Sequence, residues 1–206
     1  MRINLHTHTI FSDGGSNIKA YAEKAKINQH LVLCLTDHDY KMNRKKYIEE
    51  LLEAELVSKE IGIPIICGLE ISVFYEEALL FGKEACINWL ERRWGEGITH
   101  EETPSYLKEI KARYNCALVL CHPQLNTQYD KAMFESGILS LFDGYEITDH
   151  KDLFPPDKIE WLETIMPRAK QYRNFDAHHV DDFEGITNEV NIVVQNENDL
   201  IQYLRG

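Results

Sequence analysis

Apolar residues in this chain follow two patterns that alternate along the sequence. Short continuous runs predict buried strands, and longer stretches with an apolar residue every three to five positions predict amphipathic helices. The clearest strand is Leu31–Leu35, which is apolar throughout, as in a strand covered on both faces. The clearest helix runs from Asn43 to Ile61 and ends at Gly62. This alternation is typical of βαβ units around a parallel sheet, so the sequence predicts an α/β fold.

The same reasoning predicts the other elements. We expect further strands at residues 2–8, 64–70, 78–81, 117–121, 144–148 and 172–175, and a last apolar run at 192–194. We expect further helices at residues 17–28, 83–94, 103–114, 129–136, 156–170 and 197–204. The sequence has no linker, repeat or low-complexity segment, so its 206 residues are expected to form one domain over 1–206. That length is enough for a small βα barrel.

Five of the expected strand ends carry histidine, aspartate or glutamate. His6 and His8 are two positions apart, so on a strand they face the same side, where two imidazoles could hold one metal ion. The same spacing favours Asp176 with His178 over the adjacent His179. Active sites of parallel βα barrels lie at the carboxyl ends of the strands. We therefore expect one metal site at these ends, formed by His6, His8, His38, Glu70, His122, Asp176 and His178.

Composition and charge narrow the class of protein. The chain is 44% hydrophobic and 27% charged, as expected of a soluble globular protein. Its net charge of -12 argues against duplex nucleic acid as a partner, because that mode of binding needs clustered lysine and arginine. A small phosphorylated substrate remains compatible, because bound divalent cations would reverse the local sign of an acidic pocket.

The sequence shows neither a membrane span nor a disulfide framework. No apolar run is long enough to cross a bilayer, and the N-terminus enters a strand pattern at once, without a signal peptide. We therefore expect a cytoplasmic protein without a membrane partner. The five cysteines include no Cys-x-x-Cys pair, which favours buried thiols in a reducing compartment.

The residues that carry this chemistry occur in six motifs: His6-Thr7-His8-Thr9, Ser12-Asp13-Gly14, Thr36-Asp37-His38-Asp39, Gly68-Leu69-Glu70, Cys121-His122-Pro123 and Asp176-Ala177-His178. In order and approximate spacing they resemble the motifs of the PHP (polymerase and histidinol phosphatase) superfamily, and the resemblance covers the chain from end to end. It implies a distorted (β/α)7 TIM-like barrel in a single domain. The activity that it implies is metal-dependent hydrolysis of a phosphate ester.

The resemblance also implies a ligand for each ion. One ion would bind His6, His8, Glu70 and Asp176; a second would bind Asp13, His38 and His178; Glu70 would bridge to a third, which also takes His122. Mixed imidazole and carboxylate ligands favour Mn2+ or Zn2+ over Mg2+, with Fe2+ as a further possibility. Two ions roughly 3.5–4 Å apart would share a hydroxide whose pKa is lowered toward neutrality. Asp13 and His178 are the candidate catalytic residues, as carriers of the proton.

Two departures from the family pattern concern the third ion and the substrate. Family members commonly place a histidine a few residues after the glutamate, whereas this chain reads Tyr75-Glu76-Glu77-Ala78-Leu79. The third ion would then be absent, weakly held, or served by Glu76 or Glu77. An arginine often follows the His-Pro motif, but here Gln124 does. A basic residue reaching over the pocket would replace it, and the candidates are Lys83, Arg92 and Arg93.

Several interpretations stay open at this point. Asp37 and Asp39 flank His38 and are candidates to orient imidazole rings. The leading function is a phosphoesterase for a small phosphorylated metabolite, a nucleotide or a short nucleic-acid end. The alternatives are an amidohydrolase-like C–N hydrolase and a catalytically silent metal-binding domain that serves a partner. The sequence leaves the substrate, the native metal and the oligomeric state undetermined.

Overall fold

The computed structural model of the chain describes residues 2–73, 76–123, 136–148, 156–183 and 188–206. Its strands are β1 (Arg2–Asn4), β2 (His30–Leu35), β3 (Ile65–Cys67), β4 (Leu69–Val73), β5 (Glu76–Phe81), β6 (Ala117–Leu120), β7 (Gly144–Thr148), β8 (Lys170–Asn174) and β9 (Asn188–Glu189). Its α-helices are α1 (Ile18–Ile27), α2 (Arg44–Ile61), α3 (Lys83–Gly95), α4 (Thr103–Arg113), α6 (Pro156–Ile165) and α7 (Glu197–Arg205). Short 3-10 turns occupy Ile138–Leu141 and Val180–Asp182.

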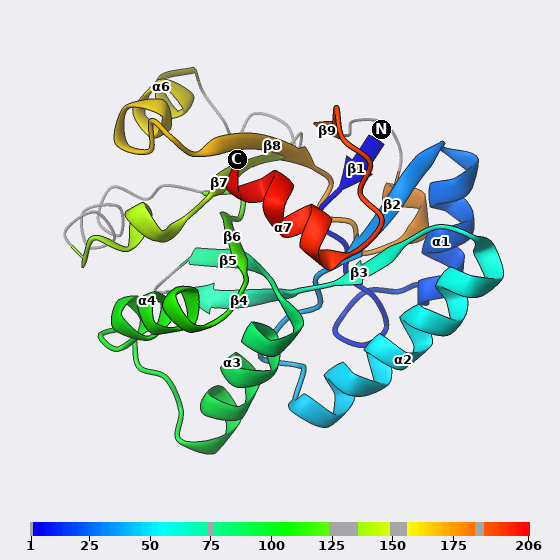
Figure 1. Cartoon of the computed structure of the whole chain (residues 1–206), viewed down its shortest axis with the longest axis horizontal. Helices are drawn as coiled ribbons and strands as arrows, with labels where there is room; N and C mark the ends of the chain where they lie inside the picture. Colours follow the sequence, from blue (N-terminus) through cyan, green and yellow to red (C-terminus); the bar gives the residue numbers. More distant parts are fainter. Residues whose placement is uncertain (1, 74–75, 124–135, 149–155, 184–187) are drawn as a thin grey trace.

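The strands form two sheets that lie side by side (Figure 1). The first has the order β3-β2-β1-β9, with β1, β2 and β3 parallel and β9 antiparallel to β1. The second has the order β4-β5-β6-β7-β8, antiparallel from β4 to β6 and parallel from β6 to β8. Isolated parallel bridges between Thr7 and Ala177 and between His38 and Glu70 join the two sheets. The α/β fold is thus confirmed, although among the described residues the strands form two sheets and not a closed (β/α)7 barrel.

The predicted strand at 64–70 divides in two at Gly68. The part before it, β3, pairs with β2 in the first sheet, and the part after it, β4, pairs with β5 in the second. A Cβ atom at Gly68 would lie 2.7 Å from the Leu80 carbonyl oxygen and 2.8 Å from Phe81 Cδ1, so the close approach to β5 requires glycine. Gly68 is therefore the point at which the chain crosses between the sheets, two residues before Glu70.

Hydrophobic burial explains why β2 is apolar throughout. Leu33 and Leu35 belong to the cluster that includes the inner sides of α1, α2 and α3, whereas Val32 and Cys34 belong to a second cluster. The second cluster also contains the apolar side of α7, including Leu200 and Leu204. Alternate residues of β2 thus enter different cores, so both faces of the strand are covered, as predicted.

Caps fix the ends of the two N-terminal helices. The side chain of Asn17 accepts a hydrogen bond from Ala20 N at the start of α1, and that of Asn43 accepts one from Lys46 N at the start of α2. Gly62 ends α2 in the left-handed conformation, with φ 79°. Helix α6 ends at Ile165, earlier than expected, because the following Pro167 disfavours helical backbone in the residue before it.

Other expectations have mixed outcomes. All five cysteines are free and buried, as predicted. The run 192–194 is not a strand, and Ile192 and Val193 are exposed. The helix expected at 129–136 lies outside the described residues except for Ser136. Within the described segments, no helix is long and apolar enough to span a membrane.

Candidate metal centre

The site lies where strand ends from both sheets meet. His6 and His8 follow β1, and His38 follows β2. Glu70 lies in β4, which enters the second sheet at Gly68. The remaining donors come from the loop after β1, from the end of β6 and from the end of β8. The structure brings together all eight residues considered from the sequence: His6, His8, Asp13, His38, Glu70, His122, Asp176 and His178.

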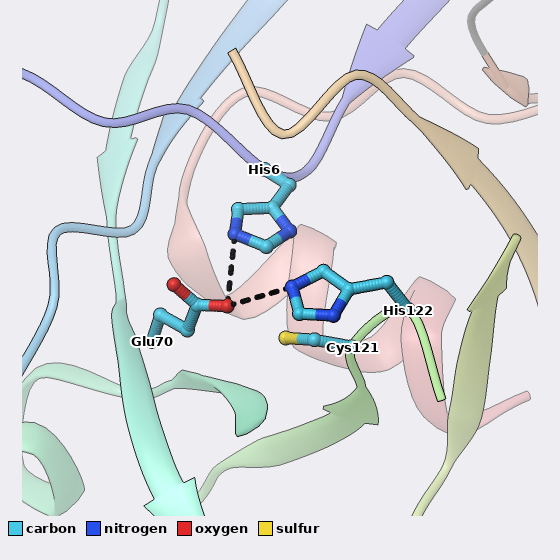
Figure 2. Close-up of side chains that lie close together, drawn as sticks. All are labelled: His6, Glu70, Cys121 and His122. Atoms are coloured by element: carbon cyan, nitrogen blue, oxygen red, sulfur yellow. Dashed lines mark ion pairs between the residues drawn. The ribbon is translucent and has the colours of Figure 1, made fainter. Parts of the chain in front are cut away.

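Glu70 occupies the centre of the cluster. Its Oε1 lies 3.2 Å from His6 Nε2 and 3.3 Å from His122 Nε2, as Figure 2 shows. Its Oε2 lies 3.2 Å from His8 Nε2 and 2.8 Å from His38 Nδ1. The side chain is 1% exposed, so a buried carboxylate is enclosed by four imidazoles.

Asp176 forms a second point of convergence. Its Oδ1 lies 3.3 Å from His6 Nε2 and 3.1 Å from His8 Nε2. The potential donor atoms of His6, His8 and Asp176 all lie within 4.8 Å of one another. Asp176 adopts a left-handed backbone with φ 50°, which is uncommon for a residue other than glycine and brings its carboxylate to the histidines that follow β1.

Asp13 lies on the more exposed side of the site, where it contacts three histidines. Its carboxylate lies 3.8 Å from His8 Nδ1, 3.6 Å from His38 Nε2 and 3.7 Å from His178 Nε2. The donor atoms of these four residues lie within 4.8 Å of one another. The backbone N–H of the neighbouring His179 donates to Asp182, and its side chain is exposed, so His178 and not His179 lies in the cluster.

Opposite charges stabilise each other across the cluster. Burial lowers the pKa of His8, but its contacts with Asp176 and Glu70 outweigh this and raise the pKa to about 9. Burial also lowers the pKa of His122, but its contact with Glu70 outweighs this and raises the pKa to about 9. The pKa of His6 is raised well above its ordinary value because the surrounding carboxylates outweigh its burial. Burial would raise the pKa of Glu70, but the charge of His6 and the other imidazoles hold it well below the usual range.

The geometry fits a divalent cation better than a network of hydrogen bonds. Among the described residues, both oxygens of Glu70, Oδ1 of Asp176 and Nδ1 of His38 are buried without a hydrogen bond of good geometry. These atoms nevertheless lie close to other donor atoms, because they point into the same small space. Buried polar atoms without partners are rare, and imidazole and carboxylate together suit Zn2+, Mn2+ or Fe2+.

Glu77 is the residue that faces the site from β5. Its Oε1 lies 3.5 Å from His38 Nδ1, and its Oε2 lies 3.8 Å from His122 Nε2. Glu76 lies on the other face of the strand by the period of two. Burial and the neighbouring Glu70 raise the pKa of Glu77. The glutamate therefore reaches the region of the expected third ion, where family members commonly have histidine.

Sequence reasoning missed Glu146. This residue of β7 is fully buried, and its Oε1 lies 3.0 Å from His6 Nδ1. A charged residue within an otherwise apolar strand, Gly144–Thr148, is the sequence signal that could have identified it. Cys121, considered only as a buried thiol, also lies in the donor group with His6 and His122 (Figure 2). Burial raises the pKa of that thiol well above its ordinary value.

Asp37 and Asp39, the candidates for orienting imidazoles, have no direct contact with an imidazole ring among the described residues, but Asp37 accepts a hydrogen bond from the Ser12 hydroxyl, whose oxygen lies 3.5 Å from His8 Nδ1. Asp37 accepts hydrogen bonds from the backbone N–H and the hydroxyl of Thr9, both at 2.8 Å. Asp39 accepts one from Trp89 Nε1 at 2.7 Å and one from Ser72 N at 3.2 Å. The two carboxylates therefore hold the loop after β1 and the helix α3 in place around the site.

The basic residues considered for substrate binding are held elsewhere. Arg93 pairs with Asp39 at 3.3 Å, and Arg92 pairs with Glu96 and Glu102. Lys83 begins α3, and its backbone N–H donates to Glu197. None of these contacts reaches the cluster.

Lys41 is a basic residue at the edge of the cluster. Its Nζ lies 3.1 Å from Asp13 Oδ2 and 5.7 Å from the centre of the Tyr40 ring. The Tyr40 ring stacks on His38, with their centres 4.5 Å apart. Burial would raise the pKa of Asp13, but Lys41 and the nearby imidazoles outweigh it and lower the pKa.

Comparison with known families agrees with this arrangement. The family model described as PHP domain matches residues 4–172. The chain belongs to the PHP family. Two curated relatives match part of this chain: an uncharacterised protein of Methanocaldococcus jannaschii is 34% identical over 74 residues, and a 5'-3' exoribonuclease of Haemophilus influenzae is 36% identical over 75 residues. The matches cover 35% and 36% of this chain but 34% and 25% of those proteins, so the chain matches a minor part of each.

Solved structures share the fold of this PHP domain. A Bifidobacterium adolescentis protein with the provisional name metal-dependent phosphoesterase has a TM-score of 0.59 at 18% identity, over 99% of this chain and 96% of its own. A Chromobacterium violaceum amidohydrolase with bound sulfate and no metal has a TM-score of 0.60 at 15% identity, over 99% and 97%. A Lactococcus lactis histidinol phosphate phosphatase, with zinc, L-histidinol and phosphate, has a TM-score of 0.52 at 16% identity, over 87% of each chain. At these identities the likeness shows the fold alone.

The position of Glu77 leads to a prediction about the number of ions. We expect about two tightly held ions per chain and a weaker third that depends on Glu77, because Glu70 and His122 alone offer too few ligands. Glu77→Ala should remove the weak binding event and leave the tight ones, as measured by calorimetric titration with Zn2+ or Mn2+ and by elemental analysis after dialysis. Glu76→Ala is the matched control on the other face of β5. An unchanged binding isotherm for Glu77→Ala would show that Glu77 is not a ligand.

Proposed function

We propose that this chain is a metal-dependent phosphoesterase that hydrolyses a phosphate ester. The observation that supports it most is the position of Glu70, a buried carboxylate without hydrogen bonds of its own but with imidazole nitrogens at 2.8–3.3 Å around both oxygens. Membership of the PHP family supports the same reading, because phosphoester hydrolysis is the activity that the resemblance implies.

The residues would divide among the ions in the following way. His6, His8, Glu70 and Asp176 would hold one ion, Asp13, His38 and His178 a second, and Glu70, Glu77 and His122 a third and weaker one. Bound Mn2+ or Zn2+ lowers the pKa of a water molecule toward neutrality and neutralises negative charge on the phosphoryl group. The Zn2+ in the Lactococcus lactis phosphatase favours zinc as the first ion to test.

Asp13 and His178 are the proposed carriers of the proton. Both are partly exposed, with side-chain exposures of 26% and 35%, so they lie between the buried cluster and solvent. Asp13 has a lowered pKa and stays ionised, so its carboxylate can accept a proton from the reacting water molecule. His178 is then the group that can take up a proton and release it toward solvent or the leaving group.

Lys41 is the proposed contact for the substrate phosphate. A cation bound at Asp13 would take over the carboxylate that Lys41 now pairs with, because two positive groups repel each other at that distance. The released ammonium would remain at the edge of the site, where an anionic substrate must enter. The side chain of Lys41 is 41% exposed, so it can move to meet a phosphate.

The net charge of the chain favours some classes of substrate over others. The net charge of -12, with Lys41 at the edge of the cluster, favours a small phosphorylated metabolite, a nucleotide or a short single-stranded end over a duplex. The exoribonuclease name of one relative supports a nucleotide end, and the histidinol phosphate phosphatase supports a metabolite. A second candidate is C–N hydrolysis, which the amidohydrolase of Chromobacterium violaceum favours through its fold.

The function is tested on metal-stripped protein that is refilled with Zn2+, Mn2+, Fe2+ or Mg2+ separately. We expect Zn2+ or Mn2+ to restore hydrolysis of an aryl phosphate, a nucleoside monophosphate or a 5'-phosphorylated oligonucleotide. His8→Ala should reduce kcat/KM by about 10³-fold or more, because it removes one of the four proposed ligands of the first ion. His100→Ala, at an exposed histidine, is the control. Failure of every ion to restore phosphate release, with hydrolysis of an amide panel instead, would favour the second candidate.

Lys41→Met tests the phosphate contact. We expect KM for a phosphate ester and the inhibition constant of inorganic phosphate to rise by about tenfold, with a smaller change in kcat, because a contact present in substrate and transition state is lost. Lys45→Met is the control, since Lys45 is 86% exposed and pairs with Glu49 on α2. An unchanged inhibition constant for phosphate would limit the role of Lys41 to neutralising Asp13.

A further inference from the structure

Glu146 is a buried carboxylate that the proposed ligand sets do not use. Its Oε1 and Oε2 lie 3.0 Å and 3.1 Å from His6 Nδ1, and the residue is fully buried in β7. The other ring nitrogen of His6, Nε2, faces Glu70 at 3.2 Å and Asp176 at 3.3 Å. His6 thus lies between a carboxylate outside the cluster and the carboxylates within it.

The same carboxylate also holds a second histidine of the cluster. Oε2 of Glu146 accepts a hydrogen bond from the backbone N–H of His122 at 3.0 Å. His6 and His122 follow β1 and β6, and their rings stack with centres 5.6 Å apart. One side chain of β7 therefore links the two histidines that contact Oε1 of Glu70.

We propose that Glu146 is a positioning residue that keeps the proton of His6 on Nδ1 and leaves Nε2 to bind the ion. A carboxylate can only accept a hydrogen bond, so the nitrogen that contacts it at 3.0 Å must carry the proton. The site is buried, so no solvent competes for that proton. This inference rests on the proposed function, because it assigns His6 as a metal ligand.

Asp143, next to β7, is a second carboxylate that serves as a comparison because it has no contact with His6. Asp143 precedes β7, accepts a hydrogen bond from Leu118 N of β6 at 2.9 Å and pairs with Lys111 at 2.8 Å. Asp143 and Glu146 therefore both hold the backbone of the β6 segment, and only Glu146 also contacts His6. A purely structural role predicts similar effects when either carboxylate becomes an amide.

The test compares Zn2+ affinity of the full chain in the wild type, Glu146→Gln and Asp143→Asn by competition with a chromogenic chelator. We expect Glu146→Gln to weaken the tightest Zn2+ binding by about 10- to 100-fold, since the amide oxygen can still accept from the His122 N–H, but the NH2 group then lies against His6 Nδ1 and disfavours a proton there. Asp143→Asn should change it by less than about threefold. Equal affinity of Glu146→Gln and the wild type would overturn the inference and leave the proposed function intact.

A second measurement reads the proton position in the wild type and uses a variant only to assign the signal. Long-range 1H–15N correlation spectra of the zinc-loaded wild type, labelled in histidine, distinguish a proton on Nδ1 from one on Nε2. We expect His6, assigned through His6→Gln, to carry its proton on Nδ1. A proton on Nε2 would overturn the inference. A wild type that binds neither Zn2+ nor Mn2+ would overturn the proposed function and the inference together.

Discussion

The structure depends on the burial of one carboxylate, that of Glu70. The side chain is 1% exposed and makes no hydrogen bond of good geometry among the described residues. An uncompensated buried charge costs several kcal/mol, so the site must supply positive charge around it. Imidazoles do so in the protein alone, as the raised pKa values of His8 and His122 and the lowered pKa of Glu70 indicate. Divalent ions can take over the same role.

The cluster lies at the junction of the two sheets, which also share the apolar core around Ile3, Val32, Leu79 and Val119. The two sheets are joined by isolated bridges between Thr7 and Ala177 and between His38 and Glu70. These bridges involve residues of the cluster or their direct neighbours, so the histidines and carboxylates lie where the two sheets meet. Ions that bind there would connect side chains from both sheets, and binding would therefore stabilise the fold as well as complete the site.

The sequence predicted that the candidate ligand residues lie close together, because their places at the ends of strands follow from local sequence patterns. Parallel strands bring their carboxyl ends together, and His6 and His8 reach the cluster from the segment after β1, which ends at Asn4 and not at residue 8 as predicted. The division of the third strand was not predictable, because it depends on the approach of Gly68 to Leu80 and Phe81 of a neighbouring strand. The assignment of the ions to these residues remains a proposal.

Contacts between residues that are far apart in the sequence could not be predicted from which residues are neighbours in the chain. Asp37 lies next to His38 in the chain, yet its carboxylate binds Thr9, because side-chain direction is set by the loop and not by sequence distance. Glu146 lies 140 residues from His6, and only the packing of β7 beside β6 and β8 brings the two together. The sequence signal for Glu146 was its charge in an apolar strand, which indicates importance but not a partner.

The most direct test of the account is the number of protons that leave the protein when the ions bind. Calorimetric titration of metal-stripped protein with Zn2+ at pH 7, in two buffers of different ionisation enthalpy, gives this number. The pKa values of His8 and His122 are raised to about 9, and that of His6 is raised well above its ordinary value, so these rings hold protons that the ions must displace. The account predicts the release of roughly two to three protons per chain. Tight binding of Zn2+ without proton release would show that these imidazoles are not exchanged between protons and metal, and would contradict it.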